Sequence, residues 1–374
     1  MGPVFPERQK RKNKTGPAAG ACAGREPAGR IHVSVRSDRQ EAETEHFGNG
    51  GTRMKKEEFT ISSRDGKETP VHCVKWIPDG VAAGQSQPAT ILQIIHGMAE
   101  YVERYEPFAR WLTERNILVC GEDHLGHGKT AQKPEELGFF CEQDPATVVV
   151  RDVHRLKKTV QDQYPGVPYF ILGHSMGSFI ARNYLFRYGS GIDGAIIMGT
   201  GMTPKKVLDV SGSLAAFQEK IYGSHHIART IDHLAFSSYN KRIPAAETPF
   251  DWLSVNRENV SRYIADPLCG YTFTLNGFET MFELIQRLYV RENLDRMPKD
   301  LPVLFISGSE DPVGGYGEQV KSVADSFTRE EGMTDVMVKL VDGCRHEILN
   351  EDNRLETYEY LLDWMKQHAS RASQ

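Results

Sequence analysis

The chain lacks several features that mark secreted, membrane-spanning or nucleic-acid-binding proteins. Its six cysteines form no Cys-x-x-Cys pair and show no paired spacing, which favours a reduced compartment over a disulfide framework. No apolar run is long enough to span a membrane, and the N-terminus has no apolar signal-peptide core. The formal net charge of −5 argues against nucleic acid as a partner. We therefore expect a cytoplasmic protein, peripheral to a membrane at most.

Large apolar residues are almost absent from residues 1–53. This segment contains ten Lys and Arg against six Asp and Glu, and it is rich in Gly, Ala and Pro. Such a composition cannot bury enough apolar surface to offset the entropy of ordering, so it predicts disorder. Because Met54 looks like a natural start, we expect residues 1–53 to be a non-native or dispensable extension.

One five-residue stretch carries the strongest chemical signal in the chain. It reads Gly173-His174-Ser175-Met176-Gly177, a Gly-x-Ser-x-Gly pattern between a short apolar stretch and the start of a predicted helix. In that setting the pattern predicts a nucleophile elbow, a sharp turn that projects the serine hydroxyl above a sheet. The two glycines are expected because a Cβ at either position would collide with neighbouring backbone.

A serine nucleophile needs a base to take its proton and an acid to orient that base. Downstream, Asp311 follows a predicted buried strand, and His346 follows the next one. The order Ser, acid, His is the one found in α/β-hydrolases. We choose Asp311 as the acid; Glu310 is the second choice, and Asp325 and Asp342 are weaker ones. His346 is the predicted base.

The oxyanion of a tetrahedral intermediate also needs donors. One donor is expected at the N–H group after the nucleophile, which belongs to Met176, and the other in the loop after an early strand, at Met98. Gly97 beside it would let the backbone approach the nucleophile closely.

These motifs resemble the monoacylglycerol lipase and lysophospholipase branch of the α/β-hydrolases, which is also described as serine-aminopeptidase-like. The resemblance covers roughly residues 57–366 and implies the triad Ser175, Asp311 and His346, donors at Met98 and Met176, and a lid after the sixth strand. Lys129 and Thr130 depart from the family pattern, which has small polar residues directly after the Gly-His-Gly loop at residues 126–128. The matching segments are His96-Gly97-Met98, Asp123-His124-Leu125-Gly126-His127-Gly128, Gly173-His174-Ser175-Met176-Gly177, Asp311-Pro312-Val313 and Arg345-His346-Glu347.

Predicted strands and helices alternate along most of the chain, which indicates a mostly parallel sheet with helices on both faces, the α/β-hydrolase fold. An initial hairpin is expected around Arg64-Asp65-Gly66, and Asp144 is expected to cap a helix that starts at Pro145. The alternation stops between residues 201 and 293. We therefore assign 54–200 and 294–374 to the hydrolase core and 201–293 to an inserted helical cap.

Many large apolar residues lie in this predicted cap. We expect most of them to hold the cap to the core and a few to line a pocket above the serine. They are Leu214, Phe217, Ile221, Tyr222, Phe278, Met281, Phe282, Leu284 and Ile285. The cap histidines His225, His226 and His233 lack further ligands at metal-binding spacing, so we predict no metal site there.

The predicted enzyme is a serine hydrolase that cleaves carboxylic esters of single-chain lipids through an acyl-enzyme, with no metal or organic cofactor. Its partners would be a small-molecule acyl ester and, transiently, a membrane surface touched by the cap. A serine aminopeptidase is the enzymatic alternative, and it would need a carboxylate such as Glu219, Asp232 or Glu279 to hold a free ammonium group. A ligand-binding receptor on a hydrolase fold is the alternative from another class.

Overall fold

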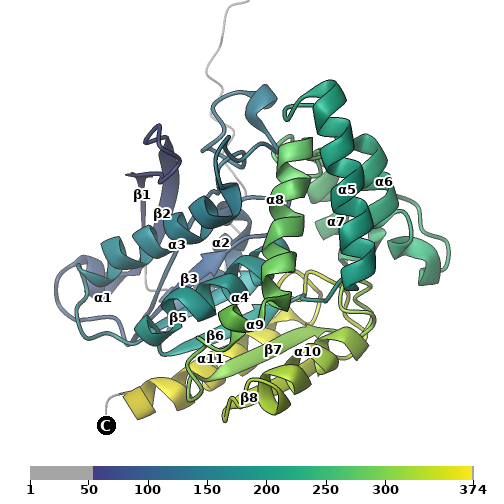
Figure 1. Cartoon of the computed structure of the whole chain (residues 1–374). Coiled ribbons are helices and arrows are strands. Elements are labelled where there is room, and N and C mark those ends of the chain that lie inside the picture. The colour runs from purple at the N-terminus through teal and green to yellow at the C-terminus, as the bar shows by residue number, and fades with distance from the viewer. Residues whose placement is uncertain (1–53, 373–374) are drawn as a thin grey trace, which may run out of the picture. The chain divides into compact units, whose positions relative to one another are not determined.

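The computed structural model describes residues 54–372, so the extension predicted at 1–53 lies outside the described residues. Within that part of the chain, eight strands form one sheet in the order β1-β2-β4-β3-β5-β6-β7-β8 (Figure 1). The strands are β1 Met54–Ser62, β2 Pro70–Pro78, β3 Thr90–Ile95, β4 Ile117–Glu122, β5 Tyr169–His174, β6 Gly194–Met198, β7 Val303–Gly308 and β8 Val336–Val341.

The first two strands form the expected hairpin. β1 pairs antiparallel with β2, β2 pairs antiparallel with β4, and every other neighbouring pair is parallel. The predicted α/β-hydrolase fold, a mostly parallel sheet, is therefore confirmed. Because the central strands are parallel, their carboxyl ends share one edge, where ligands bind in open α/β sheets.

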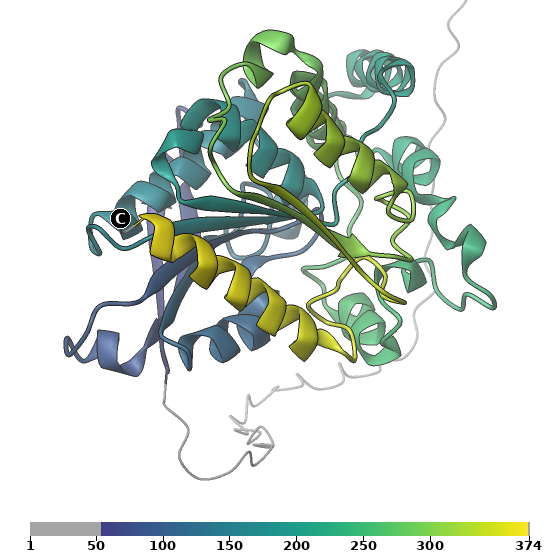
Figure 2. The ribbon, with the colours of Figure 1, turned by 90° about the horizontal axis from the view of Figure 1, so that it is seen from below.

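Helices cover both faces of this sheet (Figure 2). The α-helices of the described residues, including those of the insertion, are α1 Asp79–Ala82, α2 Glu106–Thr113, α3 Pro145–Gln161, α4 Met176–Tyr188, α5 Lys205–Tyr222, α6 Arg229–Phe236, α7 Arg257–Ala265, α8 Leu275–Gln286, α9 Arg291–Leu294, α10 Glu318–Arg329 and α11 Arg354–Ala372. None of the helices within residues 54–372 is long and apolar enough to cross a bilayer.

Side chains of each central strand alternate between two apolar layers. In β3, Ile91 and Ile95 belong to the core shared with α3, α4 and α10, whereas Leu92 and Ile94 belong to the core shared with α2 and α11. Strands covered on both faces consist of nearly continuous apolar residues. The sheet is thereby held rigidly from both sides, and the loops at its carboxyl edge have a fixed base.

One local prediction is wrong. Asp144 does not cap α3: it has a left-handed φ of 47°, and its side chain makes no capping hydrogen bond. Instead its carboxylate lies 2.9 Å from Arg287 Nη2, on the far side of the insertion. The carboxylate therefore pairs with a guanidinium and not with the N–H groups of the helix, while Pro145 begins the helix as expected.

Helices α5 to α9 all lie between β6 and β7, where the predicted cap was placed. In Figure 1, α5, α6 and α7 lie together beside the sheet, and α8 lies between them and the core. α8 is largely buried, and the Asn183 amide on α4 donates to the Leu284 carbonyl at 2.8 Å. α8 therefore packs on the core although it lies inside the predicted cap. The assignment of residues 201–293 to a separate cap stays a prediction.

Candidate active site

Ser175 occupies the turn between β5 and α4. Its backbone angles, φ 54° and ψ −119°, are rare for a residue with a side chain. A Cβ on Gly173 would lie 2.3 Å from the Gly177 oxygen, and one on Gly177 would lie 2.0 Å from the Ile95 oxygen. The Ser175 N–H donates to the Met198 carbonyl at 3.0 Å, which ties the turn to the end of β6. The strained turn is therefore possible only with glycine on both sides.

The Asp311 and His346 side chains meet at the carboxyl edge of the sheet, in the loops after β7 and β8. Nδ1 of His346 lies 2.9 Å from Oδ2 of Asp311, and both side chains are buried. Ser307 Oγ donates to the same oxygen at 2.8 Å, and the Val313 N–H donates to Oδ1 at 2.9 Å. Burial alone would raise the pKa of Asp311, but the nearby imidazole and these hydrogen bonds lower it below its usual value. Asp311 can thus hold the ring in one orientation.

A cavity of about 1100 Å³ joins the predicted residues. Ser175, His346, Met98 and Met176 all line it. Nε2 of His346 is buried and has no hydrogen-bond partner among the described residues. The ring can therefore accept a proton at this nitrogen while Asp311 holds Nδ1.

The other acids weighed for the triad lie elsewhere. Glu310, Asp325 and Asp342 are exposed. Of the four candidates, only Asp311 is hydrogen-bonded to the histidine. Its assignment as the catalytic acid stays a prediction that this geometry favours.

The predicted oxyanion donors have no competing acceptor. Met176 is the first residue of α4, so its N–H has no partner within the helix. Among the described residues, neither its N–H nor that of Met98 donates a hydrogen bond. A Cβ on Gly97 would lie 3.1 Å from the Ser175 Cβ, so glycine is what lets this loop approach the turn. Both N–H groups are free to bind a developing negative charge.

A buried ion-pair network that the sequence did not predict lies beside these residues. The Arg104 guanidinium donates to both carboxylate oxygens of Glu347 at 2.8 Å and to Glu100 Oε2 at 2.6 Å. Burial alone would raise the pKa of both carboxyl groups. His174 and Arg104 hold the pKa of Glu100 well below its usual value, and Arg104 does the same for Glu347 more weakly. Both acids are therefore ionised and paired.

This network touches each part of the candidate site. Glu100 Oε1 accepts from the Gly97 N–H at 2.7 Å and from the Tyr105 hydroxyl at 2.9 Å, and it lies 3.2 Å from Nδ1 of His174. Glu347 directly follows His346. The sequence offered only one indication of this network, the position of Glu347 next to His346. No motif links it to Glu100, which lies far away in the chain.

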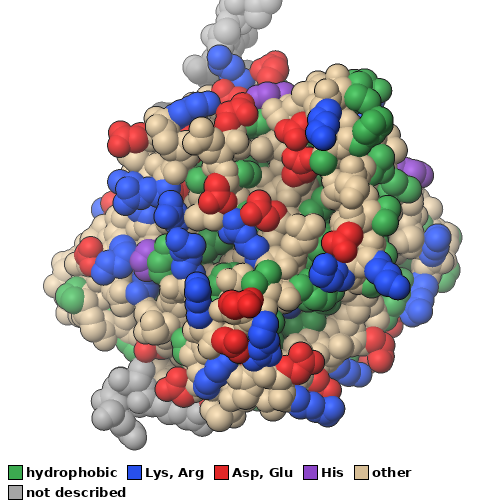
Figure 3. All heavy atoms as spheres, viewed as in Figure 1, with side chains coloured by type: hydrophobic (Ala, Val, Ile, Leu, Met, Phe, Trp, Pro, Cys, Tyr) green, Lys and Arg blue, Asp and Glu red, His purple; other side chains and the backbone are tan. Residues whose placement is uncertain are grey.

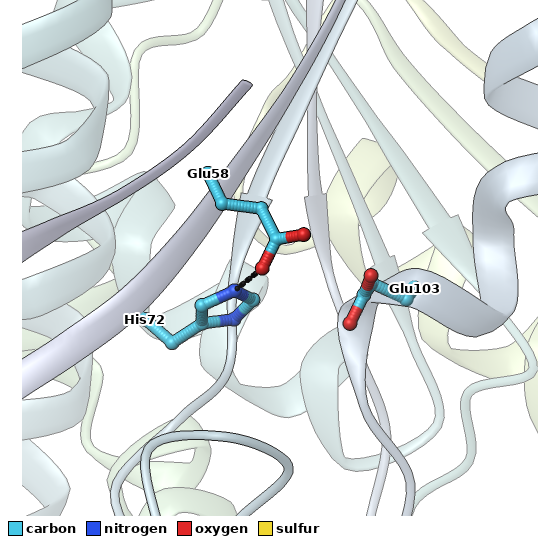
Figure 4. Close-up of side chains that lie close together, drawn as sticks. All are labelled: Glu58, His72 and Glu103. Atoms are coloured by element: carbon cyan, nitrogen blue, oxygen red, sulfur yellow. Dashed lines mark hydrogen bonds and ion pairs between the residues drawn. The ribbon is translucent and has the colours of Figure 1, made fainter. Parts of the chain in front are cut away.

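A second charged cluster lies on β1, β2 and the 3₁₀ turn Val102–Tyr105, where Glu58, His72 and Glu103 face one another (Figure 4). The Lys129 ammonium lies 2.8 Å from both carboxylates, and His72 Nε2 lies 2.9 Å from Glu58. The hydrogen bonds from Lys129 and His72 lower the pKa of Glu58 to about 2. Since an ammonium group already neutralises these carboxylates, we interpret the cluster as an ion-pair network rather than a metal centre. It also gives Lys129, which departs from the family pattern, a structural role.

Apolar and polar residues of the insertion complete the cavity. Of the apolar residues weighed above, Leu214, Met281, Phe282 and Ile285 line it, whereas Phe217, Ile221 and Tyr222 are exposed. Among the carboxylates weighed for an aminopeptidase, Asp232 lines the cavity and Glu219 and Glu279 do not. The expectation that no metal or cofactor is needed stays a prediction.

Comparisons with known proteins show the family and the relatives of this chain. A family model described as serine aminopeptidase, S33, matches residues 86–353. The monoglyceride lipase of Rattus norvegicus is 27% identical over 289 residues, covering 75% of this chain and 84% of that protein. A monoglyceride lipase homolog of Monkeypox virus is 34% identical over 286 residues, covering 76% and 90%. The structure of a thermostable carboxyl esterase from Bacillus coagulans is 31% identical, with a TM-score of 0.74, covering 85% of this chain and 100% of that one.

Proposed function

The chain belongs to the serine aminopeptidase S33 family, and from this membership we propose that it is a serine hydrolase that cleaves carboxylic esters of single-chain lipids. The monoglyceride lipases among its relatives support an acyl ester as substrate. The observation that carries the proposal is that Ser175 and the Asp311-bound His346 line the same large cavity.

The proposed reaction uses only groups of this chain. Nε2 of His346 takes the Ser175 hydroxyl proton as the oxygen attacks the ester carbonyl, and Asp311 stabilises the imidazolium that forms. The N–H groups of Met98 and Met176 bind the tetrahedral oxyanion. His346 then gives its proton to the leaving alcohol, an acyl-enzyme remains, and water repeats the sequence to release the fatty acid.

The apolar residues that line the cavity favour an aliphatic acyl chain as the bound part of the substrate. Phe179 on α4 lines the cavity together with apolar residues of α5 and α8, among them Leu214, Met281, Phe282 and Ile285. Burying a methylene group stabilises a complex by about 0.8 kcal/mol, so each added carbon should raise kcat/KM by up to about fourfold until the cavity is full.

We therefore expect kcat/KM to rise from p-nitrophenyl acetate towards the medium-chain esters in a series that ends at palmitate. Alanine and proline p-nitroanilides should be poor substrates, and a fluorophosphonate should label Ser175. Values that fall from acetate onward would contradict the lipid pocket. Fast anilide cleavage would instead favour the aminopeptidase, for which Asp232 in the cavity wall is the candidate ammonium partner. Thermal shifts by ligands without any turnover would favour a receptor.

We further propose that α5 contacts a membrane surface transiently. Val210, Phe217 and Ile221 share one side of this helix at seven- and four-residue spacing, and they are 70%, 62% and 55% exposed. Figure 3 shows hydrophobic side chains gathered at the upper right, where α5 lies. An apolar helix face of this kind can be buried at the boundary between headgroups and acyl chains.

The double variant Phe217→Ser, Ile221→Ser should bind phosphatidylcholine vesicles at least about tenfold more weakly in co-sedimentation, because each side chain loses apolar burial. Leu355→Ser is the matched control, since Leu355 is 54% exposed on α11, on the other side of the sheet. Equal binding by both variants would contradict the assignment to α5.

A further inference from the structure

The leaving alcohol must lie against the His346 ring, because this ring returns the proton to the alcohol oxygen. The groups of the insertion that contact the ring are therefore the ones that meet the alcohol. The 3₁₀ turn η5, Asp251–Leu253, brings Trp252 to this place. The centroids of the indole and imidazole rings are 5.1 Å apart, and Trp252 lines the cavity.

Hydrogen bonds to backbone carbonyls in and beside η5 fix this turn to the loop that carries the histidine. Arg345 Nη1 donates to the Asp251 carbonyl at 2.8 Å and to the Ser254 carbonyl at 2.9 Å. The Glu347 N–H donates to the Leu253 carbonyl at 2.7 Å. The residues on both sides of the histidine thus hold the turn, so the tryptophan keeps its position relative to the imidazole.

Three rings form an aromatic shelf, defined as Phe236, Tyr239 and Trp252, in the cavity wall. The Tyr239 ring lies 4.9 Å from the Trp252 ring, and the Phe236 ring lies 5.5 Å from the Tyr239 ring. The backbone N–H of Trp252 donates a hydrogen bond to Asn240 Oδ1 at 2.9 Å. The shelf is therefore built by tertiary contacts as well as by local chain geometry.

The polar groups of this shelf are the Tyr239 hydroxyl and the Trp252 indole N–H. Among residues 54–372, no hydrogen bond involves the Tyr239 hydroxyl or the Trp252 indole N–H. Tyrosine and tryptophan side chains in protein interiors usually have a partner for these groups. Two donors without protein partners, on a shelf whose Trp252 ring packs against the His346 ring, are suited to the oxygens of a bound alcohol.

A carboxylate sets the charge of the same wall. Asp232 lies one helical turn before Phe236 on α6, lines the cavity and is half-buried. Its side chain makes no hydrogen bond or ion pair within the described part of the chain. An unpaired negative charge in a partly desolvated wall accepts hydrogen bonds from hydroxyl groups and repels phosphate oxygens.

We propose that Tyr239 and Trp252 form the binding site for the leaving alcohol, and that Asp232 makes this site prefer uncharged hydroxyl-bearing alcohols over anionic headgroups. The inference rests on the proposed ester hydrolysis and narrows its substrates. A polyol can use all three groups, because its hydroxyls accept from the two donors and donate to the carboxylate. A phosphodiester headgroup would bring a second negative charge to Asp232.

The first test compares two lauroyl esters that differ only in the alcohol, 1-lauroylglycerol and methyl laurate. Tyr239→Phe and Trp252→Phe remove a donor and keep a ring, so each should lower the ratio of the two kcat/KM values about three- to tenfold. Tyr360→Phe on α11 is the matched control and should leave the ratio unchanged. Equal losses on both esters, with wild-type melting temperatures, would overturn the alcohol site.

The second test uses Asp232→Asn, which removes the charge and keeps the shape. The ratio of kcat/KM for lauroyl-lysophosphatidylglycerol to that for 1-lauroylglycerol should rise at least about threefold. An unchanged ratio overturns the charge preference. If the wild type cleaves methyl laurate but no variant changes either ratio, the alcohol site fails alone. If the wild type cleaves no lauroyl ester, the proposed function fails, and the alcohol site fails with it.

Discussion

Replacing Asp311 by Asn is expected to lower kcat for ester hydrolysis by about 10³- to 10⁴-fold, the scale expected when a triad imidazole is held in the wrong tautomer. The reason lies in how the carboxylate is held. The Val313 N–H donates to Oδ1 and would keep the amide oxygen of the variant on that side. The amide NH₂ would then replace Oδ2 and face Nδ1 of His346, which is 2.9 Å away in the native protein. With a donor opposite Nδ1, the ring proton moves to Nε2, and the ring can no longer accept from Ser175.

The measurement is kcat with a medium-chain p-nitrophenyl ester, with thermal unfolding to establish that the variant folds. Glu310→Gln is the matched control, because Glu310 is the adjacent acid and is exposed. It should retain nearly full activity. If Glu310→Gln were inactive and Asp311→Asn active, the catalytic acid would be Glu310.

Ser175→Ala should abolish turnover and should not affect the fold.

Local sequence was enough for features whose cause is also local. The two glycines of the elbow are required by atoms of the same turn and of the adjacent strand, so a short motif predicts them. The sheet could be predicted because apolar stretches alternate with amphipathic helices. Asp144 shows the limit, since its pairing with Arg287 depends on a residue of the insertion that no capping rule considers.

The parts of the site that could not be predicted come from contacts between distant segments. Arg104 and Glu347 are 243 residues apart in the chain and are brought together only by the fold. Trp252 and Tyr239 lie in a segment with no repeating pattern. Arg345 and the Glu347 N–H hold the turn that places Trp252 beside His346, and Tyr239 packs against Trp252. Residue type alone would have assigned them to the core of the cap.

Arg104→Met is expected to lower the free energy of unfolding at neutral pH by about 3 to 5 kcal/mol, because removing one partner of a buried ion pair leaves uncompensated charge. The guanidinium is the shared partner of Glu100 and Glu347, and both carboxylates are buried. Arg110→Met is the matched control. Arg110 lies six residues further along the chain, but its side chain is 58% exposed, and among the described residues it pairs with Glu106 alone. Its loss should cost less than about 1 kcal/mol.

The pH dependence distinguishes lost charge pairing from lost packing. In the native protein the pKa values of Glu100 and Glu347 are lowered, so the stability they contribute is full above the unfolded-state pKa and is lost as the pH falls through the folded-state values. Without Arg104, burial should raise the pKa of Glu347 above its unfolded-state value, whereas Glu100 keeps its hydrogen bond with His174. The variant should therefore lose stability as the pH rises. The deficit relative to wild type should therefore grow between pH 5 and pH 8.

A second substitution completes the argument. Glu347→Gln in the Arg104→Met background removes the carboxylate that has lost its cation, so it should recover part of the lost stability, whereas Glu347→Gln alone should destabilise the protein. The measurements are urea unfolding at pH 5 and pH 8 for the wild type, both single variants and the double variant. A deficit that is equal at both pH values, with additive effects of the two substitutions, would mean that Arg104 contributes only packing. Coupling between the two substitutions would instead show that the Arg104 guanidinium holds the Gly97 loop and the His346 loop together through Glu100 and Glu347. A residue that does not line the cavity would then position the catalytic groups.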